Sequence, residues 1–252
     1  MKMYALDCGH LGGRLKDMIE GEDGEVDLPI PAYLIEHPKG NVLFDTGMHP
    51  QLQTDAAAKL GPLARIFKFD NFRPGDEVGA RLTAIGRDPA RIDYVINSHL
   101  HFDHAGGNAQ IPNATLVLQR RELEIGRDAE RAAQFGFDPE NVTQGHPVRA
   151  IDGEHDLFGD GRIVCLPTHG HTPGHQSLKL RLDSGEVVLA ADACYFCRTL
   201  RERRLPRFVH DREAMLDSLE RLGRLEQGGA RIFFGHDAEF WAALPQNGRP
   251  II

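Results

Sequence analysis

The chain has 252 residues, of which 41% are hydrophobic and 26% are charged, as in ordinary globular proteins. This length allows one large domain with its own core, and we expect a single domain over residues 1–252. The net charge of −8 disfavours nucleic acid as a partner, because phosphates would be repelled on average.

Short apolar and β-branched runs predict the strands, and spaced apolar residues predict the helices. The expected strands are residues 4–7, 32–36, 42–45, 92–97, 115–119, 163–167, 177–182, 186–191 and 231–234. The expected helices are residues 76–85, 121–134 and 211–225, and the last has Met215, Leu219, Leu222 and Leu225 on one face. Two groups of strands, each followed by helices, predict two packed sheets with helices outside them.

Two segments, residues 10–31 and 47–75, are less regular and carry scattered large apolar side chains. Such segments either form binding loops or cap the core, and the pattern leaves both interpretations open. A third segment is rich in arginine: Arg198, Arg201, Arg203, Arg204 and Arg207. We favour a solvated loop or a clamp for the fold over a basic binding patch.

Targeting signals and cysteine usage indicate a reducing compartment. The N-terminus lacks the apolar core of a signal peptide, and no run of about 20 apolar residues predicts a membrane span. We therefore expect a cytoplasmic protein without a membrane partner. The spacing of Cys8, Cys165, Cys194 and Cys197 suggests no disulfide framework, and Cys194-x-x-Cys197 has no second pair to complete a four-thiolate site. Both thiols are expected to be buried or half-buried.

The most specific motif is His99-Leu100-His101-Phe102-Asp103-His104, which follows the expected strand 92–97 and precedes Ala105-Gly106-Gly107-Asn108. On an extended backbone, the imidazoles of His99 and His101 point to the same side. Asp103 and His104 come at the turning end of the motif and can serve a second ion. Four potential ligands in six positions predict two adjacent metals, which is typical of a hydrolase.

Further ligands are expected at strand ends downstream. His175 precedes the strand at 177–182, Asp192 ends the strand at 186–191, and His236 follows the strand at 231–234. His99, His101 and His175 would then hold one ion, Asp103, His104 and His236 the other, and Asp192 would bridge them. Imidazole and carboxylate without thiolate favour two zinc ions, or manganese, iron or cobalt. A water shared by two such ions has its pKa lowered towards about 7.

These residues, in this order, resemble the metallo-β-lactamase superfamily, and Asp45-Thr46-Gly47 is similar to its early Asp-Thr-Gly turn. The resemblance implies an α/β fold, a four-layer αββα sandwich with the metals at one edge of the sheets. Within the superfamily the chain is most similar to the quorum-quenching N-acyl homoserine lactone lactonases. The segment Thr172-Pro173-Gly174-His175-Gln176-Ser177 and the tyrosine of Asp192-Ala193-Cys194-Tyr195 resemble theirs.

The resemblance implies a zinc-dependent hydrolase that opens the lactone ring of N-acyl homoserine lactones by attack of a metal-held hydroxide. Tyr195 would stabilise the oxyanion, and Asp103, besides ligating, would carry a proton to the leaving alkoxide. Phe102 and Tyr195 would contact the small-molecule substrate. Whether the protein is a monomer or a homodimer is left open.

Several other activities use related sites. One alternative is a hydrolase of another lactone or of a thioester, like glyoxalase II, although only sixteen residues follow His236 where that group usually adds a glutathione-binding region. A mononuclear-iron persulfide dioxygenase would need only part of the ligand set. A nuclease would want more basic charge, and a β-lactamase is disfavoured by the full two-ion set with a bridging aspartate.

Overall fold

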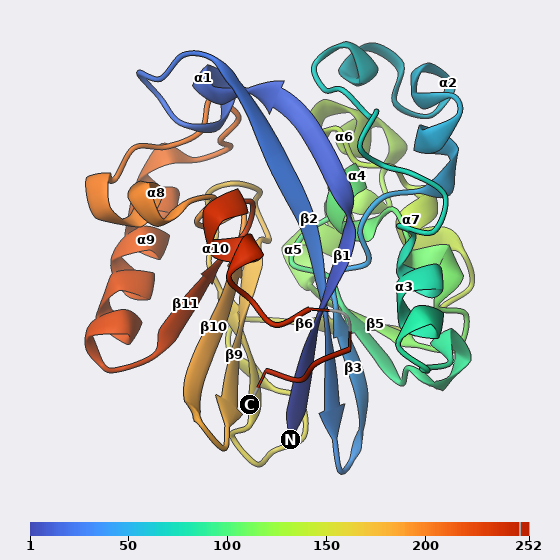
Figure 1. Cartoon of the computed structure of the whole chain (residues 1–252), viewed down its shortest axis with the longest axis vertical. Coiled ribbons are helices and arrows are strands. Elements are labelled where there is room, and N and C mark those ends of the chain that lie inside the picture. The colour runs from blue at the N-terminus through green and yellow to red at the C-terminus, as the bar shows by residue number, and fades with distance from the viewer. Residues whose placement is uncertain (247, 252) are drawn as a thin grey trace.

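Two facing β-sheets form the centre of the molecule in the computed structural model, which describes residues 1–246 and 248–251 (Figure 1). The first sheet has the order β1-β2-β3-β4-β5-β6 and the second β11-β10-β9-β8-β7. The first comprises β1 (Lys2–Arg14), β2 (Glu25–His37), β3 (Gly40–Phe44), β4 (Tyr94–Ile96), β5 (Thr115–Gln119) and β6 (Val148–Ile151). The second comprises β7 (His155–Asp156), β8 (Ile163–Pro167), β9 (Gln176–Leu182), β10 (Gly185–Ala191) and β11 (Arg231–Phe234).

Helices surround the two sheets, on their outer faces and at their ends (Figure 1). They are α1 (Leu15–Met18), α2 (Ala56–Leu60), α3 (Val78–Ala84), α4 (Phe102–Ala105), α5 (Arg120–Gly126), α6 (Ala129–Phe135), α7 (Glu140–Thr143), α8 (Cys197–Glu202), α9 (Arg212–Gln227) and α10 (Ala238–Ala242). Short 3-10 turns lie at Pro50–Gln53, Gly61–Arg65, Pro89–Arg91 and Asn108–Gln110. Figure 1 shows α9 outside the second sheet and α3 outside the first.

The alternation of side chains along the strands builds three apolar layers. Val187 and Leu189 of β10 point into the core between the sheets, where they join Tyr33 and Phe44 of the first sheet. Their neighbour Val188 points outward and packs with Met215, Leu219 and Leu222 of α9. On the far side, Leu43 of β3 packs with Val78 and Leu82 of α3. The predicted four-layer αββα sandwich is therefore confirmed.

Each predicted strand is present, but two expectations about local structure are wrong. Much of 10–31 is regular, because β1 continues to Arg14 and β2 begins at Glu25, and the two strands pair on both sides of an irregularity between Asp7 and His10. The helix expected over 121–134 is two helices, α5 and α6. The carboxylate of Asp128 accepts hydrogen bonds from the backbone N–H groups of Glu130 and Arg131 and so begins a new helix.

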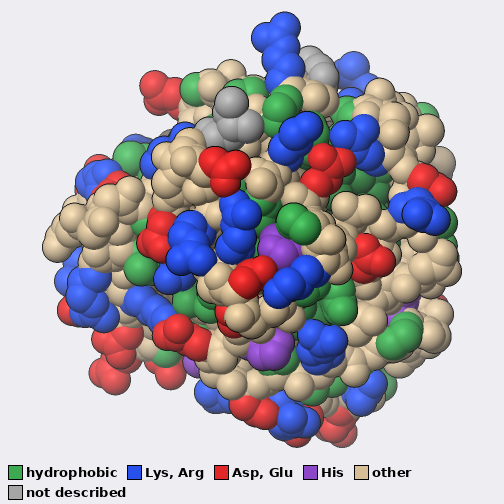
Figure 2. Space-filling model, turned by 90° about the horizontal axis from the view of Figure 1, so that it is seen from below, with side chains coloured by type: hydrophobic (Ala, Val, Ile, Leu, Met, Phe, Trp, Pro, Cys, Tyr) green, Lys and Arg blue, Asp and Glu red, His purple; other side chains and the backbone are tan. Residues whose placement is uncertain are grey.

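The arginine-rich segment is a clamp. Arg204 donates to the carbonyl oxygen of Glu20 at 2.6 and 2.8 Å and pairs with Glu22, while Arg207 pairs with the buried carboxylate of Asp17. These contacts fix residues 204–207 beside the turn between β1 and β2. On the face in Figure 2, basic and acidic side chains are interspersed. Among the described residues, no helix is long and apolar enough to cross a membrane.

Candidate metal centre

The histidine-rich motif changes conformation halfway along. His99 and His101 lie on the irregular segment that leaves β4, and His101 is the N-cap residue of α4, whose single turn carries Asp103 and His104. The turn after β3 holds α4 in place: Thr46 donates from its backbone N–H and its hydroxyl to the carbonyl oxygen of His104, at 2.8 and 3.1 Å. The motif therefore presents ligands from two directions.

The other ligand candidates also come from loops that follow strands. His171 lies between β8 and β9, Asp192 directly follows β10, and His236 follows β11. The His171 loop packs tightly on α9, since a Cβ atom at Gly170 would lie 2.3 Å from the backbone nitrogen of Met215. Gly170 also has a φ of +128°, which favours glycine, so two constraints select this residue.

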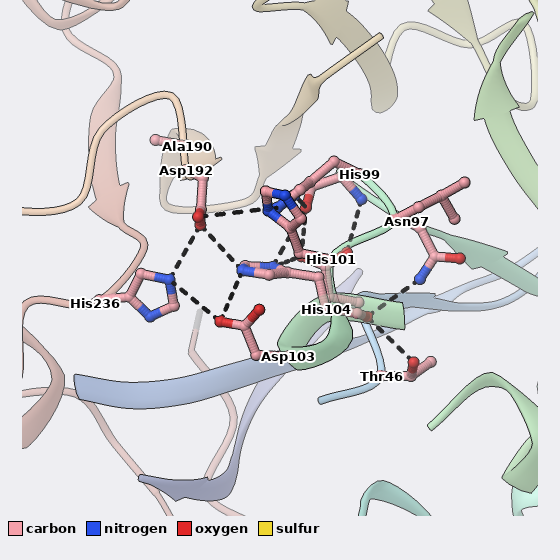
Figure 3. Close-up of polar contacts among 12 residues, drawn as sticks. Thr46, Asn97, His99, His101, Asp103, His104, Ala190, Asp192 and His236 are labelled. Carbon is pink, nitrogen blue, oxygen red and sulfur yellow. Dashed lines mark hydrogen bonds and ion pairs between the residues drawn. The ribbon is translucent and has the colours of Figure 1, made fainter. Parts of the chain in front are cut away.

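The donor atoms form two neighbouring groups, one of His99, His101, His171 and Asp192 and one of Asp103, His104 and His236. Asp192 lies between the groups (Figure 3). Its Oδ2 is 3.2 Å from Nε2 of His171, and its Oδ1 is 3.0 Å from Nε2 of His104 and 3.1 Å from Nε2 of His236. One carboxylate thus offers one oxygen to each group.

The structure corrects one predicted ligand: His171, rather than His175, lies in the first group. The Nδ1 atom of His175 is 3.0 Å from the hydroxyl of Thr168, and its Nε2 is buried without a hydrogen-bond partner among the described residues. Both histidines belong to the loop of residues 168–175 between β8 and β9, so spacing alone does not distinguish them. His171 reaches the group because its ring turns towards His101, with 2.9 Å between Nε2 and Nδ1.

Each clustered imidazole is held by the nitrogen that faces away from the group. The acceptors are the carbonyl oxygens of Phe135 for His101, Phe208 for His171 and Pro29 for His236, the carboxylate of Asp45 for His104, and the hydroxyl of Ser98 for His99. Carbonyl and carboxylate oxygens can only accept, and the Ser98 hydroxyl donates its proton to Asp45. The outer nitrogen therefore carries the proton, and in a neutral ring the inner nitrogen presents its lone pair.

The converging lone pairs fit a metal ion. Nδ1 of His101 lies 2.8 Å from Nε2 of His99 and 2.9 Å from Nε2 of His171, although neither pair has a proton to share when the outer nitrogens donate. In the second group, Nε2 of His104 and Nε2 of His236 both face Oδ1 of Asp192, at 3.0 and 3.1 Å. Such atoms are costly to bury alone, and a cation between them removes the cost.

Without an ion, the electrostatics differ between the two groups. Burial would lower the pKa of His104 and His236, but Asp192 raises it above the usual value, so these two rings would lose a proton when a cation binds. Burial lowers the pKa of His99, His101 and His171 and keeps their rings neutral, the form that ligates metals. Burial would raise the pKa of Asp192, but the neighbouring His104, His236 and His171 lower it well below its usual range. The bridging carboxylate is therefore held ionised.

A cavity of about 1320 Å³ opens onto the two groups, and its lining includes His101, Asp103, His171, Asp192, Tyr195 and His236. Phe102 forms part of its apolar wall and contacts Phe67, with ring centroids 5.6 Å apart. Parts of both less regular segments line it, including Met18, Leu28, Leu60 and Leu63, whereas Leu11 and Phe72 are buried in the core. These segments therefore serve both roles left open above.

Tyr195 lies on the cavity wall beside the second group, its ring centroid 5.2 Å from that of His236. Burial, with Asp192 and Asp103 nearby, raises the pKa of its phenol well above the usual value. The group thus remains a neutral hydrogen-bond donor. Cys194 is buried and Cys197 is half-buried, and both are free thiols as expected.

Comparison with known proteins agrees with this geometry. The metallo-beta-lactamase superfamily pattern matches residues 26–236. The chain is 33% identical to the N-acyl homoserine lactonase AttM of Azorhizobium caulinodans, over 97% of this chain and 96% of that protein. It is 32% identical to AiiA of Bacillus thuringiensis subsp. kurstaki, covering 85% of this chain and 83% of AiiA.

A solved N-acyl homoserine lactone hydrolase with N-hexanoyl-L-homoserine at its catalytic metal centre superposes with a TM-score of 0.87. That match has 29% identity and covers 99% of this chain and 98% of the other. The dizinc lactonase AidC, at 17% identity, shares the fold with a TM-score of 0.72 over 94% of this chain and 87% of its own. From its sequence pattern, its metal-binding cluster and its fold, the chain belongs to the metallo-β-lactamase superfamily and, within it, to the family of the N-acyl homoserine lactonases.

Proposed function

We propose that the protein hydrolyses N-acyl homoserine lactones with two zinc ions. His99, His101 and His171 would hold one ion, Asp103, His104 and His236 the other, and Asp192 would bridge them. The observation that carries this proposal is the placement of Asp192, which offers one oxygen to each histidine group. When bound, the ion pair would supply a nucleophilic hydroxide at neutral pH and polarise the lactone carbonyl.

The chain's own residues would bind the lactone and move its protons. The Tyr195 phenol, neutral and directed at the site, would donate a hydrogen bond to the carbonyl oxygen as negative charge develops on it. The Asp103 carboxylate lines the same cavity. It would take the proton of the attacking hydroxyl group and pass it to the ring oxygen as the C–O bond breaks, so that the product is a carboxylate and an alcohol. The product would be the ring-opened N-acyl homoserine.

The apolar wall would bind the acyl chain. Phe102 stands next to Asp103 in the sequence and contacts both Phe67 and Phe69, with ring centroids 5.6 and 6.2 Å from its own. Burial of each methylene on such a surface contributes about 0.8 kcal/mol. The four free cysteines further support a reducing, cytoplasmic setting.

The test is a pH-drop assay of the zinc-loaded protein on a panel of lactones, thioesters and phosphodiesters. We expect acid release from N-acyl homoserine lactones and little from the others. Faster thioester cleavage would favour the glyoxalase II alternative. Metal analysis addresses the oxidoreductase alternative, since two zinc ions per chain support the proposal and one iron ion contradicts it.

A further inference from the structure

The carboxyl group of Glu122 is completely buried, although it takes no part in the mechanism above. The residue lies in the first turn of α5, on the helix that follows β5. Burial raises the pKa of this carboxyl group to about 7, even though three hydrogen bonds to it lower the pKa. Burying a carboxyl group costs free energy unless its oxygens are hydrogen-bonded. The three hydrogen-bond partners of Glu122 indicate what the buried group holds in place.

All three partners belong to the loops that carry the first histidine group. Oε1 of Glu122 accepts from the backbone N–H of Leu100 at 3.2 Å. Oε2 accepts from the hydroxyl of Thr172 at 3.0 Å and from the backbone N–H of Gly174 at 2.8 Å. Leu100 lies between His99 and His101, and Thr172 follows His171. One side chain therefore joins two loops that are distant in the sequence.

Gly174 allows the loop that carries Thr172 to lie close to helix α5. A Cβ atom at Gly174 would lie 2.5 Å from the backbone nitrogen of Glu122, a distance that no alanine could occupy without a backbone shift. Because the helix and the loop touch at their main chains, a change in the Glu122 side chain will be transmitted to the loop.

The second group has different supports. The Nδ1 atom of His104 donates to Asp45 at 2.9 Å, and that of His236 donates to the carbonyl oxygen of Pro29 at 2.9 Å. The hydrogen bonds of the Glu122 carboxylate go to Leu100, Thr172 and Gly174, not to these supports. Asp45 also reaches His99 of the first group through the Ser98 hydroxyl, whereas all three hydrogen bonds of Glu122 go to the loops that carry the first group.

We propose that Glu122 is a positioning residue that holds His99, His101 and His171 in the geometry needed for one of the two ions. This inference rests on the proposed dinuclear site. Loss of an outer brace typically weakens metal binding by roughly 10- to 100-fold. The loss should fall on one ion and spare the other, which a general loosening of the fold would not do.

The experiment uses full-length Glu122→Gln and Thr172→Val, with Glu124→Gln as the matched control because Glu124 is exposed on the same helix. The glutamine keeps the size of the side chain but turns an NH2 group towards one of its N–H partners. The valine removes a single donor. Stepwise zinc affinities are measured by chelator competition, and folding is checked by circular dichroism.

We expect two distinguishable zinc affinities in the wild-type and control proteins. One of the two steps should fall roughly 10- to 100-fold in Glu122→Gln and by less in Thr172→Val, with the other step unchanged. Unchanged affinities, or equal loss of both ions in a folded variant, would overturn the proposal. If Glu122→Gln does not fold, Thr172→Val decides between the same two outcomes.

Lactone hydrolysis by the wild-type protein is scored separately. A protein that binds two zinc ions but cleaves no lactone would contradict the proposed function and leave the role of Glu122 intact. Two bound ions with active hydrolysis, but no selective loss in Glu122→Gln, would contradict only the role of Glu122.

Discussion

Nε2 of His171 lies 2.9 Å from Nδ1 of His101, although the residues are seventy positions apart in the chain. This contact places His171 in the metal centre, whereas His175 lies behind it. We expect His171→Ala to bind one zinc ion fewer and His175→Ala to keep both ions with reduced stability. Metal analysis after gel filtration measures the stoichiometry. Loss of zinc from His175→Ala alone would reverse the assignment.

Asp192 is the residue whose replacement should affect both ions. Its two oxygens face different histidine groups, so Asp192→Ala removes one ligand from each ion and also the charge that balances them. We expect the variant to lose both bound zinc ions and its lactonase activity. A purified variant that retains two zinc ions per chain would rule out the bridging role.

Tyr195 should act on the reaction without holding metal. Tyr195→Phe removes only the hydroxyl group, and loss of one oxyanion donor typically lowers kcat by about 10²- to 10³-fold. We expect this fall in kcat with two zinc ions still bound and with the KM little changed. Kinetics on an N-acyl homoserine lactone would measure both constants, and a wild-type kcat would exclude the phenol from the reaction.

The thiols beside Tyr195 should be dispensable. Cys194 is buried and makes its contact with the carbonyl oxygen of Phe196, and neither Cys194 nor Cys197 is a member of the metal-binding groups. The double variant Cys194→Ser and Cys197→Ser should keep its metal and its activity and lose about 1 kcal/mol of stability. Loss of activity with both ions retained would reveal a thiol function.

His10 should make stability depend on pH in the alkaline range. Its hydrogen bond to Asp7 makes the largest contribution and raises the pKa of the ring. Burial lowers the pKa, and Asp27 raises it further, so that the pKa of His10 rises from 6.5 to about 9. Because the pKa is higher in the folded than in the unfolded protein, protonated His10 contributes its full stabilisation at pH values below the pKa of the unfolded state. That contribution disappears as the pH rises through about 9.

The check is the free energy of unfolding of wild type and His10→Gln between pH 6 and 10, a range chosen to span about 6.5 to 9. The difference between the two proteins should be largest near pH 6 and should shrink towards zero above about pH 9. A difference that does not vary with pH would show that the ring is not charged in the fold.

Buried strands and the long helix α9 were predictable because the spacing of their apolar residues over a short stretch of sequence indicates which side chains are buried. The alternation of Val187, Val188 and Leu189 and the stripe of Met215, Leu219 and Leu222 need no tertiary information. The short edge strands β6 and β7 were missed because their residues are mostly half-exposed and leave no apolar run. Sequence patterns of this length are too short to distinguish from loops.

In the site, the sequence identified the motif at 99–104, Asp192 and His236, because each directly follows an apolar strand. It named His175 as a ligand where the structure has His171 in the group, because the choice depends on how one loop turns against α9. Glu122 carried no signal either, because a glutamate in the first turn of a helix is ordinarily a favourable surface residue. Its burial becomes visible only when the two ligand loops are folded over it.

The backbone oxygens of Phe135 and Phe208 brace His101 and His171, and both residues also line the cavity. The walls that would select an acyl chain and the scaffold that orients the imidazoles are therefore the same stretches of polypeptide. Engineers who reshape these walls by exchanging whole loops should expect the enzyme to release its metal. Side-chain replacements that leave the main-chain path untouched offer the safer route to new substrates.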